Sequence, residues 1–361
     1  MPELKADEIE RYLRSIIGST ARVLAVEVLG EPRGDQIKGY GYGKPVLIHY
    51  EVQGDRRKAV LHTVSPGPFG HEHMSDRAQS LLWEHSTFNR LPNHVRSIDV
   101  GAFRPDGSAI SLGGAEEFFL LTEYAEGRGY FEDLMRMRDD PSSKDLDISR
   151  ADALSDYLVE IHQTCGSDPG LYVRRIRELV GHAECIMGLI DSYPDRQDVV
   201  PRQLLKHLEQ RSIEWRWRLK DRVHRLRQVH GDFHPWNILF QEGTKFSLLD
   251  RSRGEWGEPA DDVTCLTMNY LFFSLQRSGR LEGNFETLFR RFWGRYLLNS
   301  RDDGILDVAA PFFLFRGLVM AHPIWYPNLS SEVRRKLFNF MQAVLSENTF
   351  DPDNVNQYCE T

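Results

Sequence analysis

The chain has 361 residues, of which 41% are hydrophobic and 27% charged, and its 45 Lys and Arg against 53 Asp and Glu leave a formal net charge of −8. This length and composition fit a folded protein of about two domains. The acidic balance argues against a nucleic-acid partner, because phosphate binding requires the opposite charge. The most apolar stretch, residues 308–315, ends at Arg316 and is far shorter than the roughly 20 residues of a membrane-spanning helix, so no membrane contact is expected.

The N-terminal sequence MPELKADEIERYL has the pattern of an acidic amphipathic helix and differs from a secretory signal. The four cysteines lie far apart and form no Cys-x-x-Cys pair, so neither a disulfide framework nor a thiolate metal site is expected. Both observations predict a protein of the reducing cytoplasm.

About the first 125 residues contain four short stretches in which apolar and polar residues alternate or β-branched and aromatic residues gather. These predicted strands are residues 22–28, 45–52, 58–64 and 117–124. Residues 74–89 have the pattern of a helix packed on a sheet. Beyond residue 127 helical spacing dominates, as in residues 150–163, apart from one β-hairpin near residues 226–250.

The predicted fold is therefore of the α+β class. Residues 1–126 would form a small antiparallel sheet with one helix, and residues 127–361 would form a larger, mostly helical body. The two glycines in residues 126–129 (EGRG) would supply flexible backbone between them.

One stretch, residues 229–240 (VHGDFHPWNILF), places polar residues between two predicted strands. A turn at residues 241–244 and a partner strand at residues 246–249 follow, and Asp250 comes directly after that strand. This hairpin would hold Asp232, Asn237 and Asp250 at one end of a two-stranded ribbon. All three residue types are common in turns, where they satisfy local backbone, but a turn alone does not account for three of them at this spacing.

These side chains suit phosphoryl transfer from a magnesium nucleotide. Mg²⁺ prefers hard oxygen ligands, which Asn237 and Asp250 would supply as an amide and a carboxylate. Asp232 would be the catalytic residue that accepts the proton of the attacking hydroxyl. The Asp-x4-Asn spacing also matches the catalytic loop of protein kinases, and the later Asp matches their metal-binding residue.

The glycine in His230-Gly231-Asp232, together with His234 and Pro235, makes this segment resemble the aminoglycoside phosphotransferase and choline kinase-like family. The resemblance extends over about residues 20–325. It implies a bilobal protein-kinase-like fold. It also implies a small-molecule kinase that transfers the γ-phosphoryl group of ATP or GTP to a hydroxyl of a small acceptor, with Mg²⁺ as cofactor.

The same resemblance implies roles for further residues. Asp262 takes the place of a structural Asp of the family, and residues 119–127 (FLLTEYAEG) resemble its strand-to-hinge segment. By that match the Glu123 carbonyl and the Ala125 amide would contact the adenine base. His230 and His234 would brace the catalytic loop, because the Gly and Pro between them disfavour a metal-binding helix.

The phosphate contacts expected from the N-terminal region are less regular. Gly39, Gly41 and Gly43 lie in the sequence KGYGYGK between two predicted strands, where kinase-like folds cover the phosphates with backbone amides. Glycines equally make simple hairpin turns. On the next strand, Val60 and His62 would face the nucleotide.

Kinase-like enzymes place a lysine on this strand, but here His62 takes that position and no lysine occurs from residue 59 to residue 143. Lys58 shares a strand face with Val60 and His62 and lies about two residues early. The carboxylate that would pair with such a lysine stays open among Glu72, Asp76 and Glu84.

Several alternatives stay open. His62 favours a catalytically weak, nucleotide-binding regulatory or scaffold protein on the same fold, and nucleotidyl transfer is a third option. The sequence indicates only that the acceptor is a small hydroxylated molecule. A cationic acceptor would be favoured if acidic residues line the helical body. Arg316 would either contact substrate or support an acidic group such as Asp262. Residues 71–73 (HEH) invite a zinc interpretation, but no third ligand is placed by spacing, so a solvated loop is expected.

Overall fold

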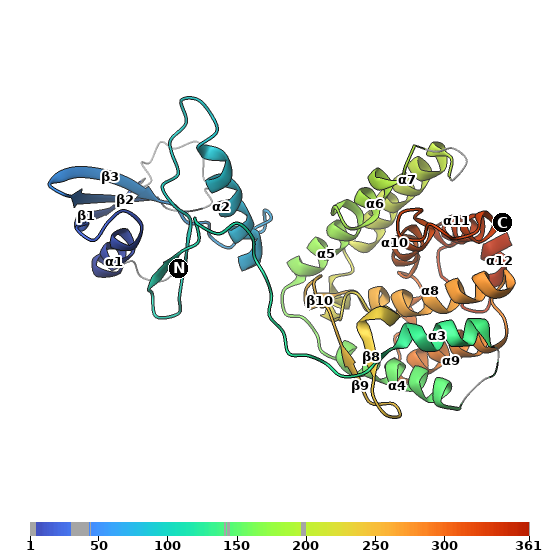
Figure 1. Ribbon diagram of the computed structural model, residues 1–361. Helices are drawn as coiled ribbons and strands as arrows, with labels where there is room; N and C mark the ends of the chain where they lie inside the picture. The colour runs from blue at the N-terminus through green and yellow to red at the C-terminus, as the bar shows by residue number, and fades with distance from the viewer. Residues whose placement is uncertain are drawn as a thin grey trace. The chain divides into compact units, whose positions relative to one another are not determined.

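The computed structural model describes residues 5–29, 43, 45–140, 142, 145–195 and 200–360. It consists of two compact units, Met1–Thr122 and Glu123–Thr361, which we call the small unit and the large unit (Figure 1). The boundary predicted from the sequence, after residue 126, lies four residues beyond this division. The α+β class is confirmed, since the small unit is built on antiparallel strands and the large unit is mostly helical.

An antiparallel sheet organises the small unit. Its strands, in spatial order, are β1 (Arg22–Val28), β2 (Val46–Val52) and β3 (Asp55–Leu61). The turn between β2 and β3 consists of Gln53 and Gly54, whose φ angles are 54° and 88°. Two successive positive φ angles match the tight hairpin turn that suits the right-handed twist of the strands.

One face of this sheet is covered by α1 (Ala6–Ile16). Every second residue of β2 is buried, as expected for a strand with one covered face. Ile9 and Leu13 of α1 pack there against Ile48 and Tyr50 of β2. The amphipathic N-terminal segment therefore supplies the apolar cover of the sheet.

The small unit also contains α2 (Met74–Phe88) and the hairpin of β4 (Gly101–Phe103) and β5 (Ala109–Ser111). The helix predicted at residues 74–89 forms. Its predicted packing on the sheet is wrong, because none of its residues is buried and the buried sheet face belongs to α1 instead.

Residues 117–124 do not form the fourth strand predicted from their composition. Phe119, Leu120 and Leu121 are 91%, 87% and 87% exposed. An isolated apolar segment gains β structure only by pairing with a neighbour, and no strand of the described residues pairs with this one. The flexible connection predicted at residues 126–129 is wrong in part, since Arg128 and Gly129 pair with strand residues of the large unit.

The large unit combines short strands with many helices. Its strands are β6 (Arg128–Gly129), β7 (Arg227–Gln228), β8 (Ile238–Phe240), β9 (Phe246–Leu248) and β10 (Trp256–Gly257), with 3-10 turns η1 (Val223–Arg225), η2 (Pro235–Asn237) and η3 (Asp303–Ile305). Its helices are α3 (Tyr130–Asp139), α4 (Asp145–His162), α5 (Pro169–Gly181), α6 (Ile186–Ser192), α7 (Arg202–Leu219), α8 (Pro259–Ser278), α9 (Gly283–Ser300), α10 (Ala310–Ala321), α11 (Ser331–Ser346) and α12 (Val355–Glu360).

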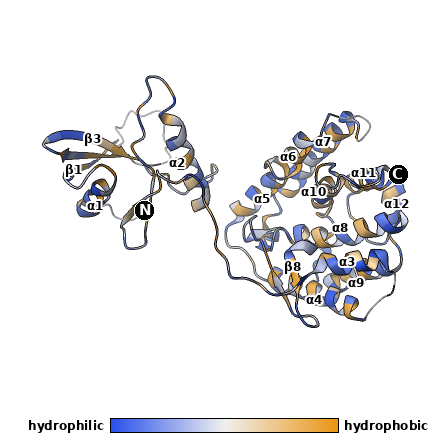
Figure 2. Ribbon diagram, in the orientation of Figure 1, coloured by the Kyte–Doolittle hydropathy of each residue, from blue (hydrophilic) through white to orange (hydrophobic). Residues whose placement is uncertain are grey.

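The core of the large unit is centred on α8, which is buried without interruption from Pro259 to Leu275. α3, α4, α9, α10 and α11 pack around it. The outer helices carry hydrophobic and hydrophilic residues side by side, as amphipathic helices do (Figure 2). In the part of the chain that the structure describes, no helix is both long enough and apolar enough to cross a membrane.

Candidate active site

The hairpin predicted near residues 226–250 forms, and Asn237 and Asp250 lie at one end of it. Ile238 of β8 pairs with Leu248 of β9, and the Leu249 amide donates to the Asn237 carbonyl at 2.9 Å. Asp250 is the next residue along, so Asn237 and Asp250 flank the same end of the hairpin. The Asn237 side-chain amide donates to the Asp232 carbonyl at 3.1 Å, which ties the loop of Asp232 to this end.

Asp262, in the first turn of α8, holds the backbone of the loop before Asp232. Its carboxylate accepts the backbone N–H groups of His230 and Gly231 at 2.8 and 2.7 Å. His162, at the end of α4, lies 3.1 Å from the same carboxylate through Nε2. Burial alone would raise the pKa of Asp262, but the hydrogen bond and charge of His162, followed by the charge of His230, outweigh it and lower the pKa.

The two histidines of the motif bond to the backbone of their own loop. Nδ1 of His230 accepts from the Asp232 amide at 3.3 Å, and Nδ1 of His234 accepts from the Trp236 amide at 3.2 Å. Burial lowers the pKa of His230, as it does for any histidine whose charged form is desolvated. Among the described residues, His, Cys, Asp and Glu gather nowhere in a group of three or more that could hold a metal.

Asp232 is paired with an arginine from a distant helix. Nη1 of Arg316, on α10, lies 2.5 Å from Oδ1 of Asp232, and both side chains are largely buried. Burial would raise the pKa of Asp232, but the charge of Arg316 and the hydrogen bond and charge of His234 hold it well below its usual range. Asp232 is therefore ionised at neutral pH.

The sequence left open whether Arg316 contacts substrate or supports an acidic group. In the structure it supports two carboxylates, those of Asp232 and Asp261, rather than that of Asp262. Sequence reasoning did not single out Asp261 or its second partner, Arg175 of α5. The only available signal was the Asp-Asp pair at residues 261–262, of which one member faces the loop backbone and the other faces Arg316.

Asn237 and Asp250 fit the requirements of a magnesium ion. The amide nitrogen of Asn237 is used by the Asp232 carbonyl, which leaves its amide oxygen as an acceptor. Asp250 is exposed, and its Oδ1 accepts the Ser252 amide at 3.1 Å. Its φ of 53° lies in the left-handed region, which Asp tolerates better than most residues. One amide oxygen and one carboxylate suffice for an ion that keeps several waters.

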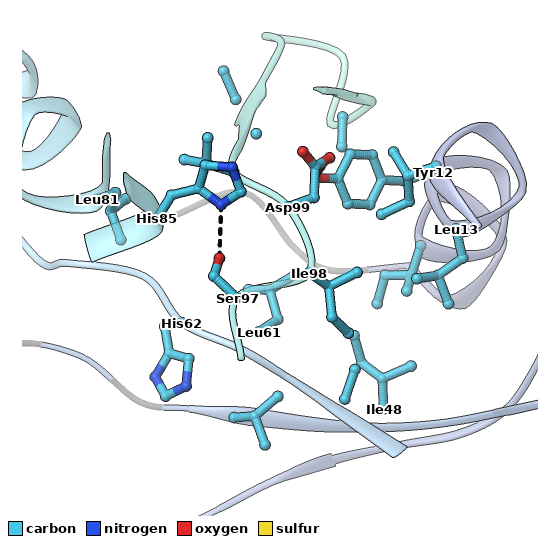
Figure 3. A pocket seen from close by; sticks show the side chains of 18 of the residues that line it. Tyr12, Leu13, Ile48, Leu61, His62, Leu81, His85, Ser97, Ile98 and Asp99 are labelled. Atoms are coloured by element: carbon cyan, nitrogen blue, oxygen red, sulfur yellow. Dashed lines mark hydrogen bonds between the residues drawn. The ribbon is translucent and has the colours of Figure 1, made fainter. Parts of the chain in front are cut away.

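Val60 and His62 line a cavity of about 440 Å³ that lies wholly within the small unit. Figure 3 shows His62 with other residues that line it. Lys58 of β3 lines it too, and Lys58, Val60 and His62, which directly follows β3, are all exposed. Of the three carboxylates considered for the helix, Glu84 lines this cavity, whereas Asp76 accepts the His73 amide at the start of α2.

The glycine segment is described only at its end. A Cβ on Gly43 would lie 1.8 Å from the Thr63 carbonyl oxygen, so only glycine fits against the backbone that follows β3. Gly39 and Gly41 lie outside the described residues. Glu123 and Ala125 belong to the large unit, in coil, and their predicted contact with adenine stays a prediction.

The sequence model of the phosphotransferase enzyme family matches residues 49–296, well over half of the chain. This match confirms the predicted family resemblance and the prediction of a phosphotransferase. A comparison with curated proteins finds no match.

Solved structures give weak similarities. A glucosamine kinase is 14% identical with a TM-score of 0.36, covering 100% of this chain and 97% of the other. The amicoumacin kinase hAmiN in complex with AMP-PNP, Ca²⁺ and Ami is 15% identical with a TM-score of 0.42, covering 93% and 92%. A Plasmodium vivax ethanolamine kinase is 10% identical with a TM-score of 0.34, covering 93% and 80%. At these scores the similarities carry no argument about activity.

Proposed function

The chain belongs to the phosphotransferase enzyme family, and on this premise we propose that it transfers the γ-phosphoryl group of ATP or GTP to a hydroxyl of a small acceptor. One observation carries the proposal: an ionised Asp232 lies in a braced loop whose hairpin also carries Asn237 and Asp250. The cytoplasmic location suggested by the cysteines stays a prediction.

In this proposal each side chain has a separate role in the transfer. Asp232 orients the acceptor hydroxyl and takes its proton as the acceptor oxygen bonds to the γ-phosphorus and the bond from that phosphorus to the β–γ bridging oxygen breaks, which releases the nucleoside diphosphate. The Asn237 amide oxygen and the Asp250 carboxylate would hold Mg²⁺, which when bound neutralises charge on the nucleotide phosphates. Asp262 keeps the loop in place through the backbone of His230 and Gly231.

The nucleotide would be gripped differently from the usual lysine arrangement. Lys58 and Val60 of β3, His62 just beyond it and Glu84 of α2 all line the cavity. Gly43 would contribute backbone near the phosphates, and Glu123 and Ala125 would contact the base. A histidine side chain is shorter than a lysine side chain, so the affinity for phosphate would be lower.

His62 also favours the second candidate, a regulatory or scaffold protein that binds nucleotide without efficient transfer. A thermal shift measurement separates this candidate from a folded chain without any nucleotide site. Stabilisation by ATP with Mg²⁺ is expected under both candidates, and only the kinase also consumes the nucleotide.

The acceptor is proposed as a small hydroxylated molecule without an assigned charge. The net charge of −8 would favour a cation. However, the neighbours whose charge lowers the pKa of Asp232 include the basic residues Arg316, His234 and Arg253. A panel of amino sugars, amino alcohols and neutral sugars, with radiolabelled ATP, tests both kinds.

The direct test is the Asp232→Ala variant. We expect it to abolish transfer from ATP while calorimetry shows nucleotide binding close to that of the wild type, because Asp232 acts on the acceptor. Mass spectrometry of the modified acceptor distinguishes a phosphoryl from a nucleotidyl increment. Equal turnover by Asp232→Ala and wild type would refute the proposed mechanism.

A further inference from the structure

We propose that Arg316 is a positioning residue for this transfer: it binds one carboxylate oxygen of Asp232 and so presents the other to the acceptor hydroxyl. This inference rests on the proposed function, because it gives Asp232 the role of accepting that proton. It adds a residue of α10 that lies 84 positions along the chain from Asp232.

Arg316 makes contacts that fix its guanidinium in one orientation. Nη1 donates to Oδ1 of Asp232 at 2.5 Å, and Nη2 donates both to the Gly231 carbonyl at 3.0 Å and to Oδ1 of Asp261 at 2.7 Å. A planar guanidinium can satisfy these three acceptors together, whereas a lysine ammonium is a point charge on a flexible stem. The geometry therefore calls for arginine at this position.

The far side of Arg316 is anchored in turn. Oδ2 of Asp261 accepts from Nη2 of Arg175 at 2.8 Å, and Nη1 of Arg175 donates to the Arg253 carbonyl at 3.1 Å. The four side chains form an alternating chain of charge, Asp232–Arg316–Asp261–Arg175, which we call the ion chain. Their side chains are 13%, 6%, 2% and 9% exposed, so water screens their interactions little.

The two oxygens of Asp232 have different surroundings. Oδ1 is held by Arg316 at 2.5 Å. Oδ2 lies 3.4 Å from Nε2 of His234, so the hydrogen bond between them is long and weak. Oδ2 is therefore the oxygen with room for a close, strong hydrogen bond from an acceptor hydroxyl.

Support of the loop does not account for this contact. The loop backbone is already held at His230 and Gly231 by Asp262, whereas Arg316 reaches the side chain of Asp232 as well as the Gly231 carbonyl. The large unit also offers a matched comparison in Arg225, a buried arginine that binds the carboxylates of Glu258 and Asp302 at 2.6–2.8 Å.

The test compares Arg316→Lys with the matched control Arg225→Lys, and uses Asp232→Asn as the reference for loss of the proton acceptor. The probe is ATP with Mg²⁺. The assay measures the release of phosphate, which reports transfer to water. For Arg316→Lys we expect kcat to fall about 10- to 100-fold, the scale of a misplacement of about 1 Å. We expect its KM for ATP to stay within about twofold of the wild-type value.

Arg225→Lys should lose a similar amount of thermal stability while keeping the wild-type kcat. A kcat loss of equal size in Arg225→Lys would show a structural effect and overturn the proposal, as would a wild-type kcat in Arg316→Lys. Asp232→Asn distinguishes failure of the proposed function from failure of the positioning role of Arg316. If this variant retains wild-type turnover, the proposed function itself is refuted, independently of the result for Arg316→Lys.

If transfer to water is too slow to measure, two further measurements test the proposal. A crystal structure of Arg316→Lys should show the Asp232 carboxylate turned from its wild-type orientation, and an unchanged carboxylate overturns the proposal. Asp261→Asn loosens Arg316 without touching Asp232, so it should shift the same carboxylate by a smaller amount and lower kcat less than Arg316→Lys does. An Asp261→Asn variant with the wild-type carboxylate orientation and kcat would likewise count against it.

Discussion

Replacing Asp262 by alanine should destabilise the large unit by about 3–5 kcal/mol, the usual cost of removing one partner from a buried charged cluster. The carboxylate is fully buried and accepts from two backbone amides, at 2.8 and 2.7 Å, with His162 at 3.1 Å. Without it the amides of His230 and Gly231 lose their acceptor, at about 1–3 kcal/mol for each buried donor. The two estimates agree in scale.

The assay is urea unfolding followed by tryptophan fluorescence, which reports mainly on the large unit because six of the seven tryptophans follow residue 122. Asp156→Ala is the matched control. Asp156 likewise accepts hydrogen bonds on both carboxylate oxygens, here from Arg295 at 2.7 and 2.6 Å, but its side chain is 46% exposed. Such a surface pair contributes about 0–1 kcal/mol. Equal unfolding free energies for the two variants would refute the argument.

The difference in unfolding free energy between wild type and Asp262→Ala should also depend on pH. The pKa of Asp262 is lowered in the folded state, so its stabilisation is fully present above its unfolded pKa of about 4. It is lost as the pH falls through the lower, folded value. The gap in unfolding free energy between wild type and Asp262→Ala should therefore narrow as the pH falls below about 4, and a gap that widens there contradicts the linkage.

Two other experiments test the role of Asp250 and the exposure of residues 118–124. Asp250→Ala should weaken nucleotide binding in the presence of Mg²⁺ and leave Mg²⁺-free binding nearly unchanged in titration calorimetry, and an equal loss in both conditions would remove Asp250 from the metal site. Chymotrypsin should cut first within residues 118–124, whose large side chains are 54–91% exposed in coil, and leave a folded large unit. First cleavage elsewhere, read by mass spectrometry of the fragments, would contradict that exposure.

The parts of the site that the sequence predicts well are local in the chain. The hairpin, its turn and the placement of Asn237 and Asp250 at one end follow from strand pattern and turn residues within about 25 positions. Two strands of the small sheet, predicted at residues 22–28 and 45–52, form almost as predicted, whereas the third, predicted at residues 58–64, runs from Asp55 to Leu61. Local pattern is enough wherever the partners are close in sequence.

The parts that the sequence does not predict depend on partners far along the chain. The strand expected at residues 117–124 had the right composition, but composition does not say which edge would pair with it. Which of α1 and α2 covers the sheet is likewise a matter of tertiary packing, because both segments carry apolar residues. Arg316 meets Asp232 across 84 positions and Asp261 across 55, and no periodicity within one helix reveals such a contact.

The ion chain bears on the choice between a kinase and a scaffold. Taking four charged side chains out of water is costly, and well-packed apolar residues often replace buried ion pairs without loss of stability. A scaffold that only bound nucleotide would gain nothing from fixing the orientation of the Asp232 carboxylate. A transferase does gain from it, since catalysis depends on charged groups that are held in place before the reaction begins. Because Arg316 is committed to that carboxylate at 2.5 Å and is anchored behind by Asp261 and Arg175, the large unit favours transfer over passive binding.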